Sequence, residues 1–150
     1  MKTNEIAKSI IDCFKKGNKL LICGNGGSAA MAQHMAAELV GKYEYERKAL
    51  PAIALTTDTS ILTALSNDYK NGFDFIFARQ VQALGKEGDI LILLSTSGKS
   101  QNCLNAWRIA IQLGIQTIDF PRKGKSTAKI QEYQLRLMHS IVRKVEKAFI

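Results

Sequence analysis

Short apolar runs alternate along this chain with longer stretches in which apolar residues recur every three or four positions. The short runs are apolar on both faces, as in strands that are buried on both sides. The predicted strands are 19–23, 51–56, 89–94 and 115–120, and the predicted helices are 3–16, 29–41, 60–65, 72–84, 101–113 and 126–150. This alternation predicts an α/β fold, with a doubly wound parallel sheet as the middle of three layers.

The last predicted helix, residues 126–150, is the longest and contains no Gly or Pro. As a continuous helix it would be about 36 Å long, which is more than a small sheet can cover. Its apolar stripe consists of Ile130, Tyr133, Leu137, Ile141, Val145 and Phe149. We therefore expect this helix to pack against another copy of the chain as well as against its own sheet.

The size and composition fit one globular domain that spans residues 1–150, with 46% hydrophobic residues. The chain has no apolar run of about 18 residues, and its first residues alternate between charged and apolar, unlike a signal peptide. We therefore expect a cytoplasmic protein without a membrane partner. Cys13, Cys23 and Cys103 have no CxxC spacing, so we expect them to be reduced packing residues.

Most of the net charge of +8 is concentrated in residues 121–150, which hold eight Lys or Arg and two Glu. A basic patch can attract nucleic acid or an anionic substrate, but along a helix it is more often a solvated face. Apart from Tyr133, no aromatic residues lie among these charges. We therefore favour the solvated face over nucleic-acid binding.

Two turns follow predicted strands and could bind a phosphate, residues 24–28 and residues 95–100. In a parallel sheet, ligands lie beyond the carboxyl ends of the strands, where helix N-termini present free N–H groups. The first turn offers glycine amides, with Ser28 placed to cap the next helix, and the second is rich in hydroxyls. Taken singly, each could equally be a tight turn or a helix cap. Neither turn matches a GxGxxG or P-loop motif, so a sugar monophosphate is the simplest candidate.

Four segments resemble the sugar isomerase (SIS) domain, which has a flavodoxin-like or Rossmann-like sheet, and within it the phosphoheptose isomerases. They are CGNGGSAAMAQHMAAELVGKY, LPAIALTTDTSILTALSNDY, GKEGDILILLSTSGKSQN and STAKIQEYQLRLMHSI. The resemblance implies a sugar-phosphate substrate, held by Asn25, Gly26, Gly27, Ser28, Asn67, Asp68, Ser95, Thr96, Ser97, Ser100 and Gln131. Asn67 and Asp68 would lie in a loop beside the sugar hydroxyls.

The resemblance also implies one zinc ion per subunit, with His34, Glu38, Gln131 and His139 as ligands. His34 and Glu38 are four residues apart, so they share one face of a helix and can bind one metal. Gln131 and His139 are about 12 Å apart along a helix, and this spacing alone does not suggest a shared ion. On the residues alone, His139 could equally be a core or interface histidine and Gln131 a surface residue.

The activity that the resemblance implies is the conversion of sedoheptulose 7-phosphate to D-glycero-D-manno-heptose 7-phosphate through an enediol. Glu38 would be the base and His139 the acid, in a homotetramer that makes heptose precursors of lipopolysaccharide or other surface glycans. The alternative is a non-catalytic SIS protein of the replication-initiator-associating type, which binds a sugar phosphate or a partner protein. The presence of both Glu38 and His139 favours the enzyme.

The chain also departs from the family pattern. The family has another strand and helix before the last helix, about 25 residues that are missing here, so residues 115–120 should form an exposed sheet edge. The fold should therefore be shortened by about one strand. Lys42 stands where the family often has Arg, which keeps the charge but loses bidentate geometry.

Overall fold

A sheet of four parallel strands forms the centre of the computed structural model, which describes residues 1–150. The strands are β1 (Leu20–Gly24), β2 (Ala52–Ala54), β3 (Ile90–Leu94) and β4 (Gln116–Asp119), in the order β2-β1-β3-β4. All three pairings are parallel, and the register sets Leu20 of β1 beside Ala52 on one side and Ile90 on the other. The predicted fold class is confirmed, and a strand forms at each of the four predicted places, although β2 covers only Ala52–Ala54 of the predicted 51–56.

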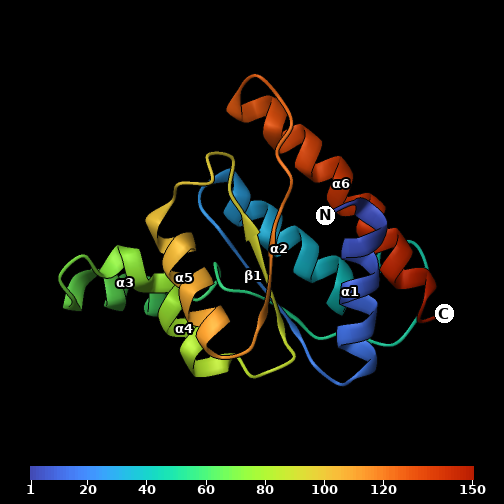
Figure 1. Cartoon of the computed structure of the whole chain (residues 1–150), viewed down its shortest axis with the longest axis horizontal. Helices are drawn as coiled ribbons and strands as arrows, with labels where there is room; N and C mark the ends of the chain where they lie inside the picture. Colours follow the sequence, from blue (N-terminus) through green and yellow to red (C-terminus); the bar gives the residue numbers. More distant parts are fainter.

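Helices cover both faces of the sheet. They are α1 (Thr3–Lys15), α2 (Gly27–Val40), α3 (Thr59–Asp68), α4 (Ile76–Leu84), α5 (Gln101–Gln112) and α6 (Thr127–Lys147). Figure 1 shows α1, α2 and α6 on one side of the strands and α3, α4 and α5 on the other. None of these helices has both the length and the apolar content that a membrane crossing requires.

The side chains of β1 show why the sheet needs two helical layers. Leu20 and Ile22 belong to the core that α1, α2 and α6 cover, whereas Leu21 and Cys23 belong to the core beneath α4 and α5. Successive side chains of a strand point to opposite faces, so a run without polar residues must be covered twice. All three cysteines are free and buried in these cores, as expected for packing residues.

Two helical predictions were wrong in detail. The helix predicted to end at Leu65 continues to Asp68, and within this last turn Ser66 Oγ donates to the carbonyl of Leu62. Residues 72–84 are not one helix, because a 3₁₀ turn, η1 (Gly72–Phe75), precedes α4. Asn71, in the left-handed conformation with φ 55°, starts this turn.

One edge of the sheet lies at β4, as predicted from the absence of the additional strand that the family has. β4 is the last strand in the order, so one of its sides has no neighbouring strand. Trp107 of α5 lies against this strand and donates from Nε1 to Thr117 Oγ1 at 2.8 Å. The prediction of an edge at residues 115–120 is confirmed.

Candidate active site

The turn between β1 and α2 is shaped by close backbone packing. A Cβ on Gly24 would lie 2.6 Å from the carbonyl oxygen of Leu94, and Gly26 has a φ of +56°. Gly26 is the N-cap of α2 and has no side chain to cap it, so Ser28 lies inside the first turn of the helix. The prediction that Ser28 caps α2 was therefore wrong. Ser28 is instead buried, and its amide donates to the carbonyl of Asn25 at 2.9 Å.

The second turn follows β3, and its backbone amides donate hydrogen bonds to the hydroxyl groups of its own serines. Gly98 has a φ of +68°, and its amide donates to Ser95 Oγ at 3.0 Å. The amide of Lys99 donates to Ser97 Oγ at 3.1 Å. Because β1 and β3 are neighbours, the two turns meet at the carboxyl edge of the sheet, where a ligand of a parallel sheet is expected.

Two amide side chains, a half-buried Asn25 and a buried Asn102, join the first turn to the start of α5, which follows the second turn. Asn25 Nδ2 donates to Asn102 Oδ1 at 2.9 Å, and Asn102 Nδ2 donates back to Asn25 Oδ1 at 2.8 Å. Asn102 also accepts from the amide of Cys103 with the same Oδ1. Asn102 was not among the predicted residues, and no local signal in the sequence marks it, since its partner is 77 residues away.

A cavity of about 310 Å³ lies between the two turns. The predicted binding residues that line it are Asn25, Gly26, Gly27, Ser28, Ser95, Thr96, Ser100 and Gln131, and Leu94 and Thr127 complete the wall. Helices α2 and α5 both begin at this cavity. The free N–H groups at their N-termini and their helix dipoles favour an anion in the cavity. Thr127, at the start of α6, was not predicted.

Three of the predicted substrate residues do not line this cavity. Ser97 is exposed at the tip of the second turn. Asn67 and Asp68 are exposed at the end of α3, where Asn67 Nδ2 donates to Asp68 Oδ1 at 3.1 Å. α3 contains no buried residue and lies on the opposite side of the sheet from α6, which carries Gln131 (Figure 1). Within one chain, Asn67 and Asp68 therefore lie apart from the other predicted residues.

A cluster of two histidines and a glutamate forms where α2 packs against α6. His34 Nε2 lies 2.8 Å from Glu38 Oε1, and His139 Nε2 lies 3.2 Å from the same oxygen. The two Nε2 atoms are 3.5 Å apart. One ligand atom from each of the three residues therefore falls within 4.8 Å of the others, close enough to hold one metal ion.

The chemistry of this cluster suits zinc. Imidazole nitrogens and carboxylate oxygens are ordinary zinc ligands. Glu38 is largely buried, and its second oxygen, Oε2, has no hydrogen-bond partner. A buried carboxylate oxygen without a donor is costly, so this group is better satisfied with a cation beside it.

Gln131 lies between the cluster and the phosphate-type turns. It lines the cavity between the turns, and it also lines a second hollow of about 450 Å³ together with His34. A Cβ on Gly27 would lie 2.6 Å from Gln131 Nε2, so the glycine makes room for this side chain. Gln131 and His139 are thus about two turns apart on α6, Gln131 at the cavity between the phosphate-type turns and His139 within the cluster.

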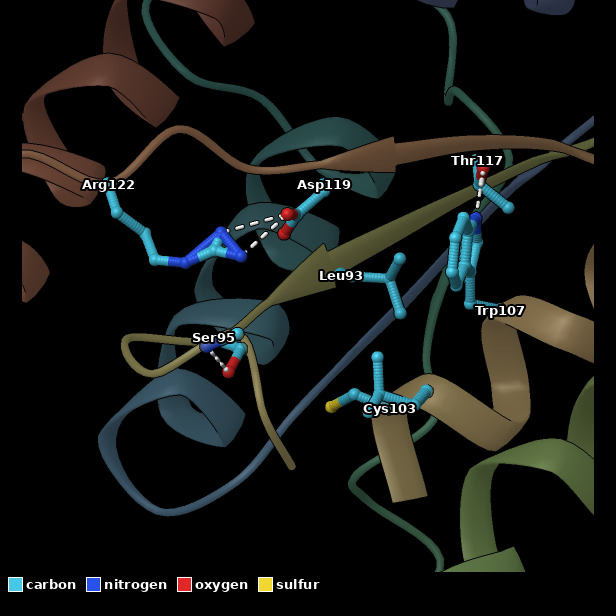
Figure 2. Close-up of a pocket in the computed structure, with 9 residues that line it drawn as sticks. Leu93, Ser95, Cys103, Trp107, Thr117, Asp119 and Arg122 are labelled. Carbon is cyan, nitrogen blue, oxygen red and sulfur yellow. Dashed lines mark hydrogen bonds and ion pairs between the residues drawn. The ribbon is translucent and has the colours of Figure 1, made fainter. Parts of the chain in front are cut away.

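A further pocket of about 360 Å³ adjoins the other side of the second turn (Figure 2). Its rim carries an ion pair in which Arg122 donates twice to Asp119 Oδ2, at 2.8 and 2.6 Å. Burial raises the pKa of Asp119, and Arg122 only partly opposes this. The guanidinium lies against Gly98, where a Cβ would approach Nη2 to 2.4 Å, so Arg122 packs on the second turn from outside.

The sequence and the fold of this chain are similar to those of known proteins. The SIS domain family model matches residues 1–120. The chain is 48% identical over 164 residues to a phosphoheptose isomerase of Campylobacter jejuni, covering 97% of this chain and 87% of the relative. The aligned stretch is longer than the 150 residues of this chain, so the relative carries residues that are missing here.

Solved structures give the same result. A phosphoheptose isomerase from Francisella tularensis superposes with a TM-score of 0.92 at 36% identity, and one from Neisseria gonorrhoeae with a TM-score of 0.88 at 38% identity. Each match covers 97% of this chain and 85% of the other.

Proposed function

We propose, from the premise that the chain belongs to the SIS domain family and within it to the phosphoheptose isomerases, that it interconverts an aldose and a ketose sugar phosphate. The specific reaction we propose is sedoheptulose 7-phosphate to D-glycero-D-manno-heptose 7-phosphate. The observation that carries this proposal is the meeting of His34, Glu38 and His139 from two helices, beside a cavity suited to a phosphate.

The cavity between the two turns would hold the phosphate group. Backbone N–H groups at the starts of α2 and α5 and the hydroxyls of Ser95, Thr96 and Ser100 surround it. Charge-assisted hydrogen bonds of this kind fix the position of an anion strongly. With the phosphate bound there, the carbonyl end of the sugar would extend along Gln131 toward the cluster.

Glu38 and His139 are suited to the two proton-transfer roles of the reaction. Glu38 would take a proton from the carbon beside the carbonyl and return it to the neighbouring carbon, and the enediol would form between these steps. His139 would exchange a proton with the sugar oxygens, so that no full oxyanion develops. His139 Nε2 lies 3.2 Å from Glu38 Oε1, so the proposed acid and base lie next to each other.

His34, Glu38 and His139, with Gln131 from the family resemblance, would hold one zinc ion per subunit. Zinc in this position would supply Lewis-acid polarisation of the sugar oxygens. Glu38 Oε1 faces both imidazoles, whereas Oε2 has no partner, so one carboxylate has two oxygens in different surroundings. This difference would allow Glu38 to contribute to the metal site and to proton transfer with separate atoms.

We also propose a homo-oligomer, a tetramer by the family resemblance, that works in the cytoplasm on heptose precursors of lipopolysaccharide or other surface glycans. Support for the oligomer comes from the apolar side chains exposed around α3, namely Ile61, Tyr69, Phe73 and Phe75. Association through this region would bring Asn67 and Asp68 to the site of a neighbouring copy, where they could bind sugar hydroxyls.

Purified protein supplied with zinc and sedoheptulose 7-phosphate should form the aldose phosphate, measured by ¹H NMR or by coupling to a kinase of the aldose. Glucose 6-phosphate, an aldohexose phosphate, serves as the control substrate and should be converted poorly. Absence of turnover with either sugar, despite phosphate-dependent binding of both, would contradict the enzyme and support a non-catalytic SIS protein.

A further inference from the structure

The loop between α2 and β2, residues 41–51, is fastened to the end of α6 by one buried carboxylate. Glu146 is fully buried, and its oxygens accept from the amides of Tyr43 at 2.9 Å, Glu44 at 2.8 Å and Tyr45 at 3.2 Å. Three charge-assisted hydrogen bonds from successive backbone groups leave the start of this loop little freedom.

Arg47, in the same loop, connects Glu146 to the end of α2. Its side chain is fully buried, and its Nε lies 3.4 Å from Glu146 Oε1. Nη2 donates to the carbonyl of Glu38 at 2.6 Å, and Nη1 donates to the carbonyls of Leu39 and Gly41. The last carbonyls of a helix have no partner within the helix, so Arg47 satisfies the end of α2 at the residue that carries the Glu38 carboxylate.

Tyr43 extends from the fastened part of the loop to His139. The two rings are stacked, with centroids 5.4 Å apart and planes inclined by 25°. On α6, Arg143 lies over the Tyr43 ring at 5.4 Å and donates to its hydroxyl at 3.1 Å, and the same guanidinium pairs with Glu44. Tyr43 is therefore held from both sides.

We propose that the 41–51 loop is a positioning device for the His34–Glu38–His139 cluster, in which Arg47 fixes the end of α2, Tyr43 fixes the ring of His139, and Glu146 holds both. That this cluster binds a metal ion rests on the proposed function. The positioning follows from the contacts of this chain alone. The second side-chain torsion of a histidine is broad, so a stacked ring decides where Nε2 points.

The effect should be measurable as metal affinity. Partners that orient metal ligands typically contribute about 10- to 100-fold in affinity or activity. Tyr43→Leu should therefore weaken zinc binding about tenfold or more in competition with a chromophoric chelator, whereas Tyr43→Phe, which keeps the ring, should stay close to the unaltered protein. Tyr45→Leu is the matched control, since Tyr45 lies in the same loop with its side chain exposed and does not stack on His139.

Arg47→Lys tests the other arm of the loop. Lysine keeps the positive charge near Glu146 but cannot reach three carbonyls with a planar group. We expect weaker zinc binding, with kcat reduced more than KM is changed. Circular dichroism and thermal unfolding of the zinc-free variant identify any loss that is only due to unfolding.

A metal-free measurement separates this proposal from the proposed function. The chain has two histidines, so the ring protons of His34 and His139 can be assigned by replacing either one. In the zinc-free protein, Tyr43→Leu should weaken the nuclear Overhauser effects between the ring protons of His34 and His139, whose ring centroids are 5.2 Å apart, while Tyr43→Phe and Tyr45→Leu should leave them in place. A Tyr43→Leu protein in which these effects and the zinc affinity are both unchanged would overturn the proposal. Failure of the unaltered protein to bind zinc would instead contradict the proposed metal site, and the effects between the two rings would still decide the positioning.

Discussion

The phosphate-type turns and the His34–Glu38–His139 cluster are built in opposite ways. The turns use backbone amides and hydroxyls at the ends of adjacent strands, so the hydrogen bonds of the sheet hold them. The cluster uses three side chains from two helices, held by packing and by the 41–51 loop. A site with many equivalent donors loses little when one is removed, whereas a site with three side chains in separate roles loses most of its function.

The largest effect should therefore come from the cluster. Glu38→Gln keeps the size of the side chain but removes the base, and general acid–base groups contribute about 10²- to 10⁴-fold to rate. We expect kcat to fall by that factor while the thermal unfolding temperature changes little. A Gln33→Glu protein, altered on an exposed position of the same helix, should keep its activity.

The next largest effect should come from the link between the turns. Asn102→Ala removes the two side-chain hydrogen bonds to the half-buried Asn25, and a hydrogen bond contributes about 0.5–1.5 kcal/mol of net stability. Urea unfolding should show this loss, and KM should rise because the two turns are no longer aligned. Gln101→Ala, at the exposed neighbouring position, is the control. Unchanged stability and KM in Asn102→Ala would show that the sheet alone aligns the turns.

A single hydroxyl of the phosphate cavity should matter less. Ser100 lines the cavity, whereas Ser97 is exposed at the tip of the same turn. Loss of one hydrogen bond to a charged group is worth about 1.5–3 kcal/mol at most, so Ser100→Ala should raise KM roughly tenfold with little change in kcat. Ser97→Ala should change neither constant. Equal effects in the two variants would mean that the substrate does not occupy this cavity.

The smallest expected effect concerns pH and the 41–51 loop. Burial acts to raise the pKa of Glu146, but the three backbone N–H donors and Arg47 outweigh it, so the pKa is lowered in the folded protein. Its contribution to stability is therefore complete above the ordinary carboxyl value of 4.5 and is lost as the pH falls through the lower, folded-state value. Unfolding midpoints of the unaltered protein and Glu146→Gln should differ at pH 7 and converge in acid. A constant difference would contradict the role of the charge.

The same contrast explains what the sequence could predict. The fold follows from apolar runs such as 90–94, because a strand without polar positions must be buried on both faces. The two turns follow from their position after these strands. Their joining residue, Asn102, could not be predicted, since its role depends on a side chain that is 77 residues away.

The cluster was less accessible to sequence reasoning. His34 and Glu38 share a helix face at four-residue spacing, but the approach of His139 depends on how α6 packs on α2, and only the family resemblance indicated it. Local spacing also gave no indication that Glu146 and Arg47 connect the two helices. The cap of α2 was missed because the backbone conformation of Gly26, with a φ of +56°, decides where this helix begins, and a residue pattern does not show that conformation.

Deuterium exchange tests most directly whether Glu38 moves a proton between neighbouring carbons of the sugar. The zinc-supplied protein should be incubated with sedoheptulose 7-phosphate in D₂O, and the carbon-bound protons next to the carbonyl followed by ¹H NMR. An enediol route with Glu38 as base predicts proton transfer between these carbons, with deuterium entering wherever Glu38 exchanges with solvent before it returns the proton, and neither transfer nor exchange with Glu38→Gln. Aldose formation or deuterium exchange that persists at the unaltered rate in Glu38→Gln would contradict the account.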